Sequence, residues 1–152
     1  MKEILIEVIK CLLPLFGVVA FESCDMKAEY GCPHADFEAK GVVTDEDGNG
    51  IQGIRVVVSM DDPSPAYKGN PHRDTLWTNH NGEYAPESPY YMHSFEYLKS
   101  IKLDFEDVDG PENGGEYQKV SMEVPVFKVK DGDGNWYNGA YEAEANVTML
   151  KK

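Results

Sequence analysis

Apolar side chains recur at every second position along most of this chain after residue 36. The segments 101–106, 120–126 and 142–149 show the alternation most clearly. In the last of these the apolar positions are Ala143, Ala145, Val147 and Met149. A period of two places alternate side chains on opposite faces of a β-strand, so that one face can be buried while the other meets water. No window of helical length after residue 24 has a 3.6-residue period, and the sequence therefore predicts an all-β domain.

Turn-forming sequences separate the predicted strands. The segment 45–50 reads DEDGNG and the segment 79–82 reads NHNG, and both are rich in residues that tight turns require. Pro125 lacks the N–H that a central strand donates, which indicates an edge strand or a bulge at that point. About seven short strands fit the remaining length, a number typical of immunoglobulin-like domains. We therefore predict that residues 37–152 fold as an antiparallel sandwich of two sheets.

The N-terminal segment differs from the rest of the chain. Residues 11–21 form a continuous apolar run, CLLPLFGVVAF, which is about half of the roughly 20 residues that a membrane-spanning helix needs. The run has the length of a signal-peptide core. Lys2 and Lys10 supply the positive charge expected before such a core, although Glu3 and Glu7 offset it. The segment is therefore predicted to be a targeting signal.

Cys24 lies where a lipoprotein signal peptidase would cut, with the small residue Ser23 before it. The thiolate is the nucleophile that accepts a diacylglyceryl group, and each buried CH₂ of the acyl chains contributes about 0.8 kcal/mol to membrane binding. We therefore predict a lipoprotein signal peptide over 1–23, and a lipid anchor and tether over 24–36. The alternatives are ordinary secretion and an apolar N-terminal helix.

Cys32 is the thiol that remains once Cys11 leaves with the signal peptide and Cys24 is acylated. A single thiol allows no intramolecular disulfide, and no CxxC spacing indicates a metal site. Cys32 is a candidate site of covalent modification. The alternative is a small buried apolar residue, which is how free cysteine usually behaves.

The chain is strongly acidic, with a formal net charge of −13 at pH 7. A surface of this sign repels phosphate backbones, which excludes nucleic acid as a partner. Ca²⁺ is held by several oxygens in a flexible loop, and one acidic stretch supplies five candidate ligands: Asp104, Asp107, Asp109, Glu112 and Asn113. Ca²⁺ is the only cofactor that the sequence suggests. The alternative is that Asp and Asn beside glycine simply form turns.

The sequence lacks the signatures of common catalytic sites. It has no GxSxG, Walker or dinucleotide-binding motif, and its four histidines lack metal-binding spacing. We therefore predict no catalytic residues and no enzymatic activity. Four aromatic residues are candidates either for a patch that contacts glycan or protein or for the sandwich core; they are Tyr90, Tyr91, Trp136 and Tyr137.

Two segments resemble signatures of carboxypeptidase-regulatory-like domains. The segment 41–56, GVVTDEDGNGIQGIRV, is similar to their opening hairpin. The segment 77–84, WTNHNGEY, is similar to their second motif, a Thr followed by a turn and Gly-x-Tyr. The resemblance implies a transthyretin-like sandwich of the kind common as a non-catalytic module on exported bacterial proteins. In this chain Ile54 and Tyr84 are expected to enter the core, and Gly82 is expected to allow the turn.

Three further motifs resemble, in the same order, a family of lipoproteins encoded beside a radical SAM enzyme in Gram-negative bacteria. They are EYGCPHAD at 29–36, FEDVDGPENGG at 105–115 and WYNGAY at 136–141. The resemblance implies a location in the cell envelope, anchored by lipid to the outer membrane. It also implies a radical SAM enzyme as a partner.

The function predicted from the sequence is that of an exported, lipid-anchored, non-catalytic β-sandwich module for binding or structural interaction. Its contacts would be the membrane, through acylated Cys24, and a protein or glycan ligand that the sequence does not identify. The alternative is a substrate or carrier protein that a radical SAM maturation system modifies near Cys32.

Overall fold

The computed structural model describes residues 32–60, 72–93 and 98–152. These residues form ten strands and no helix, which confirms the predicted all-β class. The predicted signal peptide over 1–23 and the anchor at Cys24 lie outside the described residues. Within the described part of the chain, no helix is long and apolar enough to span a bilayer. The strands are β1 (His34–Thr44), β2 (Ile54–Met60), β3 (His72–Trp77), β4 (Glu83–Tyr84), β5 (Tyr90–Met92), β6 (Ser100–Asp107), β7 (Val120–Pro125), β8 (Phe127–Asp131), β9 (Tyr137–Glu144) and β10 (Val147–Thr148).

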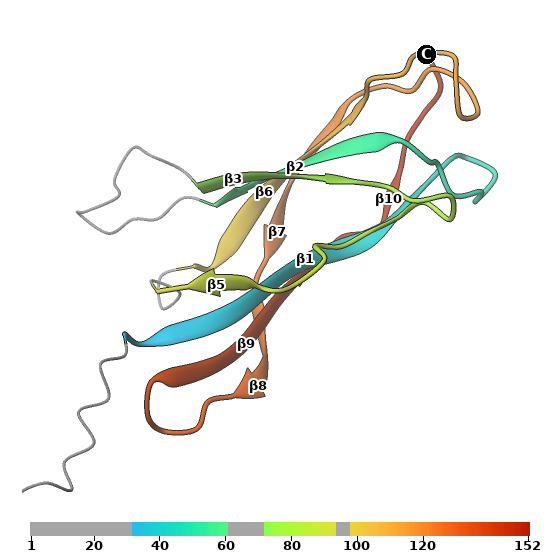
Figure 1. Ribbon diagram of the computed structural model, residues 1–152. Coiled ribbons are helices and arrows are strands. Elements are labelled where there is room, and N and C mark those ends of the chain that lie inside the picture. Colours follow the sequence, from blue (N-terminus) through green and yellow to red (C-terminus); the bar gives the residue numbers. More distant parts are fainter. Residues whose placement is uncertain (1–31, 61–71, 94–97) are drawn as a thin grey trace, which may run out of the picture. The chain divides into compact units, whose positions relative to one another are not determined.

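The strands form the two sheets of a sandwich (Figure 1). The six-stranded sheet has the order β10-β1-β9-β8, and β4 and β5 also pair with β1. The four-stranded sheet has the order β3-β2-β6-β7. This arrangement confirms the predicted two-sheet sandwich. The pairing is not purely antiparallel, because β1 runs parallel to β9 and to β10.

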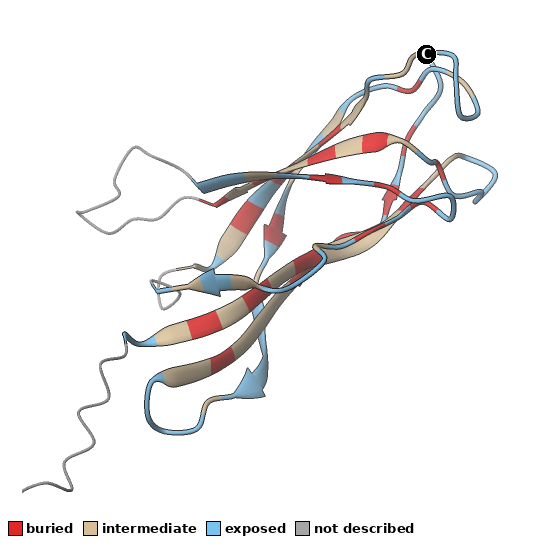
Figure 2. Cartoon of the chain, in the orientation of Figure 1, coloured by how far each residue is buried: buried red, intermediate tan, exposed pale blue. Residues whose placement is uncertain are grey.

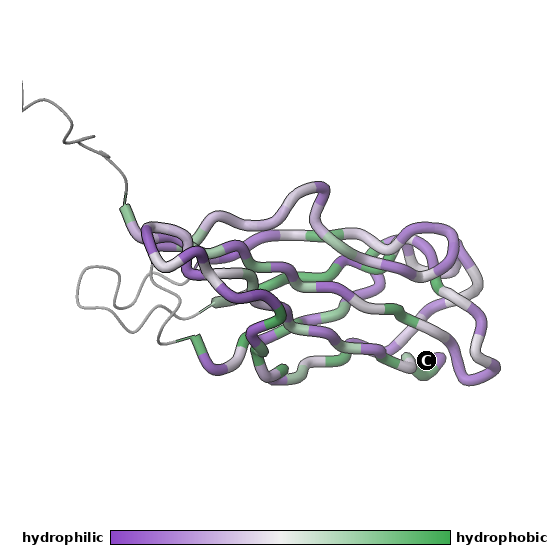
Figure 3. Tube along the Cα trace, turned by 90° about the horizontal axis from the view of Figure 1, so that it is seen from below, coloured by the Kyte–Doolittle hydropathy of each residue, from purple (hydrophilic) through white to green (hydrophobic). Residues whose placement is uncertain are grey.

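The alternation in the sequence becomes the inner faces of the two sheets. In β6, Ile101, Leu103 and Phe105 are each at most 2% exposed, whereas Lys102 between them is exposed. Buried bands alternate along the strands in Figure 2, and Figure 3 shows apolar and polar positions interspersed along the same trace. Fully burying one large apolar side chain contributes about 1.5–3 kcal/mol. The inner residues of β1 and β9 belong to the same core: Phe37, Ala39, Val43 and Ala143.

β1 and β2 belong to different sheets, so the predicted opening hairpin is not formed. The loop between them is closed by Asp45, whose Oδ1 accepts hydrogen bonds from the backbone N–H of Asp47 at 3.0 Å and of Asn49 at 2.8 Å. β2 pairs instead with β3 and β6. Each of the two strands carries one apolar row, and placing them in opposite sheets buries both rows in the shared core.

Two predicted strands are each divided in the structure. The segment 120–126 ends as β7 at Pro125, and the chain then enters the other sheet as β8. β7 is an edge strand, in agreement with the predicted effect of proline. The segment 142–149 is divided between β9 and β10 around Asn146, whose Oδ1 accepts a hydrogen bond from the Val42 N–H at 2.9 Å. All four apolar residues predicted for its inner face are buried.

The domain begins slightly before the predicted boundary at residue 37. Cys32 is the first residue of the compact unit, and β1 starts at His34. His34 pairs with Tyr137 on β9. The last residues of the predicted tether are therefore the first residues of β1.

Candidate functional site

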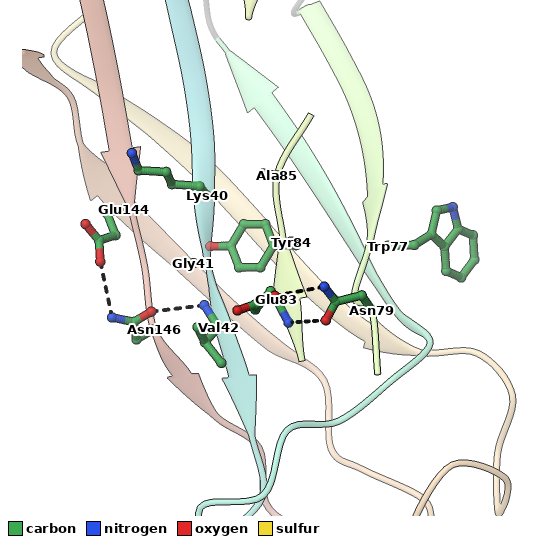
Figure 4. Close-up of a pocket in the computed structure, with 10 residues that line it drawn as sticks. All are labelled: Lys40, Gly41, Val42, Trp77, Asn79, Glu83, Tyr84, Ala85, Glu144 and Asn146. Carbon is green, nitrogen blue, oxygen red and sulfur yellow. Dashed lines mark hydrogen bonds between the residues drawn. The ribbon is translucent and has the colours of Figure 1, made fainter. Parts of the chain in front are cut away.

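Two adjoining hollows open beside the end of β3 and share Trp77 and Ala85. The first has a volume of about 530 Å³ and is lined by residues of β1, β4 and the β9–β10 segment (Figure 4). The second has a volume of about 640 Å³ and is lined by β3 and the segment 85–91. We call the two hollows together the Trp77 groove.

Tyr84 and Gly41 form the inner boundary of the first hollow. The Tyr84 side chain is buried, and its hydroxyl donates a hydrogen bond to the backbone oxygen of Ala145 at 2.8 Å. Gly41 leaves room for this contact, because a Cβ at its position would lie 1.9 Å from that same oxygen. Burial raises the pKa of the Tyr84 hydroxyl well above its ordinary value, so that the group stays a neutral donor. The boundary is therefore rigid and uncharged.

Two carboxylates at the rim of the first hollow are held by asparagine side chains. Asn79 Nδ2 donates to Glu83 Oε2 at 2.9 Å, and Asn79 Oδ1 accepts from the Glu83 N–H at 3.0 Å. On the other side, Asn146 Nδ2 donates to Glu144 Oε1 at 3.4 Å. Figure 4 shows these two pairs on opposite sides of Tyr84. The arrangement places hydrogen-bond acceptors on both sides of the hollow.

Lys40 is the cation among the residues that line the first hollow. Its Nζ lies 2.8 Å from Glu142 Oε2, and the hydrogen bond to Glu142 raises the pKa of Lys40, with smaller contributions from the charges of Glu38 and Glu144. The ammonium group is thus already shared among carboxylates. The charge of this surface is negative on balance, which disfavours anionic ligands.

Trp77 places an apolar ring between the two hollows. Strand alternation turns Leu76 into the core and Trp77 outward, and the Trp77 side chain is 53% exposed. In Figure 4 its indole points away from Tyr84. An exposed aromatic ring beside fixed polar groups is the usual composition of a recognition site.

The second hollow is lined by Tyr90, whose hydroxyl oxygen is buried near the carboxylate of Asp74. Burial raises the pKa of this hydroxyl well above its ordinary value, and the carboxylate of Asp74 raises it further. The ring stacks on Phe37 at 6.0 Å between centroids. Tyr90 is therefore mainly part of the core boundary, with its polar end toward the hollow.

Three of the four predicted patch aromatics gather at the start of β1. Tyr91 stacks on His34 at 4.5 Å between ring centroids, and Tyr137 lies 5.5 Å from the same ring. The backbone oxygen of Trp136 accepts a hydrogen bond from the His34 N–H at 2.8 Å. Tyr90 turns inward instead, because it is adjacent to Tyr91 on β5 and points to the opposite face.

Cys32 is a free, exposed thiol. The alternative interpretation of a small buried apolar residue is therefore wrong, because the chain at this point precedes β1 and is not covered by either sheet. The backbone oxygen of Cys32 lies 3.3 Å from His34 Nδ1. Cys24, the predicted anchor, lies outside the described residues.

The five predicted calcium ligands do not gather around one point. Asp104 bonds to Ser121 and Lys102 on the outer face of β6, and Asp107 accepts hydrogen bonds from the backbone of its own loop and of Tyr117. Asp109 is bonded to Asn113. Across the described ranges, no group of three or more His, Cys, Asp or Glu side chains is placed to hold a metal ion.

The sequence analysis did not identify the Trp77 groove as a site. The sequence predicts Trp77 only as part of a structural signature, and it does not single out Lys40, Glu83 or Glu144. One available signal was the position of Trp77 itself, next to the inward-facing Leu76, which predicts an exposed indole.

No protein-family model and no curated protein matches the chain. Solved structures similar to it include catechol 1,2-dioxygenase from Acinetobacter radioresistens (15% identity, TM-score 0.49, covering 77% of this chain and 52% of that one). Hydroxyquinol 1,2-dioxygenase from Pseudomonas putida is similar at 11% identity and a TM-score of 0.47, covering 82% and 59%. An (S)-allantoin synthase is similar at 14% identity and a TM-score of 0.46, covering 75% and 41%. This chain thus spans less than two thirds of the length of each.

The prediction of a non-catalytic module, and with it the exclusion of enzymatic activity, is corrected by this comparison. The similar solved structures include catechol and hydroxyquinol 1,2-dioxygenases and an allantoin synthase, all of which are enzymes. The motif search that led to the prediction covers sites with short sequence signatures and misses sites assembled from separate strands. The likeness concerns the fold and assigns no reaction to this chain.

The prediction of no cofactor other than Ca²⁺ is corrected by the same finding, because these neighbours include 1,2-dioxygenases. Among the described residues, no group of three or more His, Cys, Asp or Glu side chains is placed to hold a metal ion, and the acidic loop uses carboxylates in hydrogen bonds within the chain.

Proposed function

We propose that this chain is a lipid-anchored protein of the Gram-negative cell envelope whose β-sandwich recognises neutral carbohydrate in the Trp77 groove. A binding module and an enzyme must both bind the sugar first. The proposal therefore holds whether the bound sugar is released unchanged or is cleaved.

The envelope location is supported by the N-terminal sequence. The apolar run 11–21 and the placement of Cys24 after Ser23 are the features of a lipoprotein signal. The resemblance to lipoproteins encoded beside a radical SAM enzyme supports the outer membrane as the location and that enzyme as a partner. Its three motifs keep their order between residues 29 and 141.

The observation that carries the carbohydrate proposal is the exposed indole of Trp77, a residue that lines both hollows, beside the asparagine-held carboxylates of the first hollow. A pyranose has C–H faces that pack on an aromatic ring and hydroxyl groups that donate to carboxylates. Glu83 and Glu144 supply such acceptors, and their asparagine partners keep them in place. The negative charge of the surface favours neutral over anionic sugars.

We expect Trp77→Ala to weaken binding of neutral hexasaccharides roughly tenfold, because truncating an aromatic anchor commonly costs more than 1 kcal/mol. Chitohexaose and maltohexaose are the probes. Calorimetry on the mature acylated protein, in a detergent without a sugar headgroup, measures the affinity, and chromatography of the recovered sugar shows whether it has been cleaved.

Trp136→Ala is the matched control, since it removes the other tryptophan of the chain at the far end of β1. It should leave the affinity unchanged. Equal affinities for the two variants, or no heat with either probe, would contradict carbohydrate recognition in the groove.

A further inference from the structure

Five ring-bearing residues cluster where the chain enters the domain. At this end the start of β1 lies between β5 and the start of β9 (Figure 1). Tyr91 is 57% exposed and Trp136 is 38% exposed. We call the cluster the tether-end patch; it consists of His34, Tyr91, His93, Trp136 and Tyr137.

The tether-end patch is held together by ring contacts and by the backbone at the domain entrance. His34 stacks on Tyr91 with 19° between the ring planes, and Tyr91 meets the edge of His93 at 5.0 Å. His93 Nδ1 lies 3.3 Å from the backbone oxygen of Pro33, directly before β1. The rings of His34, Tyr91 and His93 are thus positioned by the folded domain before any partner arrives, and Trp136 adjoins them through its backbone oxygen.

The chemistry of the patch is that of a membrane interface. Tyr, Trp and His combine an apolar ring with a polar atom, and Tyr and Trp are enriched where membrane meets water. The charges beside the patch are of both signs: the Tyr137 hydroxyl donates to Asp36 at 3.1 Å, and Lys130 Nζ lies 5.5 Å from the centre of the Tyr137 ring.

The short tether between Cys24 and β1 limits how far the tether-end patch can lie from the membrane. Nine residues lie between Cys24 and His34, and the ten fully extended residue-to-residue steps span at most about 36 Å. The patch surrounds His34 and is the part of the domain that such a short tether holds nearest to the lipid. Gly41, at the Trp77 groove, lies seven residues further along β1, or about 23 Å at the rise of a β-strand.

We propose that the tether-end patch rests in the headgroup layer of the membrane that carries the Cys24 lipid, with Trp136 and Tyr91 inserted and the Trp77 groove directed away from the bilayer. The inference rests on the lipid anchor of the proposed function. The lipid surface is zwitterionic, because anionic headgroups repel a protein with 27 acidic and 14 basic residues, of which only three acidic and two basic lie before Cys24.

The two tryptophans of the chain allow a direct test. Trp77→Phe leaves Trp136 as the single reporter, and Trp136→Phe leaves Trp77. Each mature acylated variant is reconstituted into phosphatidylethanolamine–phosphatidylcholine vesicles with or without lipids brominated near the headgroup. We expect the bromolipids to lower the emission of Trp136 roughly twofold, as for an interfacial residue, and to leave that of Trp77 unchanged.

The possible outcomes distinguish failure of the proposed orientation from failure of the lipid anchor. If both variants float with the vesicles and neither tryptophan is quenched, or both are quenched equally, the orientation is overturned while the anchor stands. If the protein does not float with the vesicles, the anchor fails and the orientation fails with it. Circular dichroism of both variants checks that the sandwich is intact.

Discussion

Replacing Gly41 with alanine is expected to lower the free energy of unfolding by about 3 kcal/mol or more, a large part of the stability of a small domain. A Cβ at this position would lie 1.9 Å from the Ala145 backbone oxygen and 2.9 Å from the Tyr84 hydroxyl. Because the first of these atoms belongs to the backbone, β1 and the β9–β10 segment must move apart to admit the methyl group. Chemical denaturation measures the change.

Gly48→Ala is the matched control for Gly41→Ala. A Cβ at Gly48 meets no atom within 4 Å, and its φ of +84° is expected to cost alanine about 1–2 kcal/mol. The loss at Gly41 should therefore be clearly the larger. Equal losses at the two glycines would show that the close approach to Ala145 does not constrain β1.

Thr78→Val is expected to lower the free energy of unfolding by about 2–4 kcal/mol, because it leaves two buried backbone groups without partners. The Thr78 hydroxyl donates to the Ile51 backbone oxygen at 2.6 Å and accepts from the Ile54 N–H at 2.9 Å. The side chain is 4% exposed, so that water does not replace the hydroxyl easily. Thermal and chemical denaturation both measure this effect.

Thr78→Ser keeps the hydroxyl and removes only the methyl group, so its cost should be about 1 kcal/mol. A valine variant as stable as the serine variant would contradict the role of the hydroxyl bonds. The comparison also tests why the segment 77–84 has Thr at this position. The Thr78 side chain and backbone connect the start of β2 to the end of β3.

The inner faces of the sandwich could be predicted from the sequence because burial follows local alternation. Ile54 and Tyr84 are buried as expected, and Gly82 has the φ of +77° that its turn requires. Each of these expectations depends on a residue and its immediate neighbours in the chain. Such information is present in a single sequence.

The partners of the strands could not be predicted in the same way. The alternation predicts which side chains of β1 face inward. It does not predict that β1 pairs with β9 in parallel or that β2 lies in the other sheet. Those choices depend on how two complete apolar faces fit together. The division at Pro125 likewise follows from the chain changing sheet, whereas at Asn146 the chain stays beside β1 and the Asn146 side chain accepts the Val42 N–H.

The candidate site was less predictable than the fold because its residues come from distant parts of the chain. Lys40, Glu83 and Glu144 meet only after β1 has paired with both β4 and β9. For the acidic loop, closeness in sequence led to the prediction of a shared calcium site, which the described residues do not form. Its carboxylates are close in sequence, yet they bond to their own loop and to neighbouring side chains instead of converging. Closeness in sequence is therefore a poor guide to a shared site in a β-sandwich.

The location and the orientation proposed for this protein both depend on a lipid at Cys24, and the intact mass of the protein recovered from membranes tests that lipid most directly. We expect a chain that starts at Cys24 and carries acyl groups, with Cys24→Ser found unacylated in the soluble fraction and Cys32→Ser still acylated in the membrane. An unacylated chain that starts at Met1 would contradict the account.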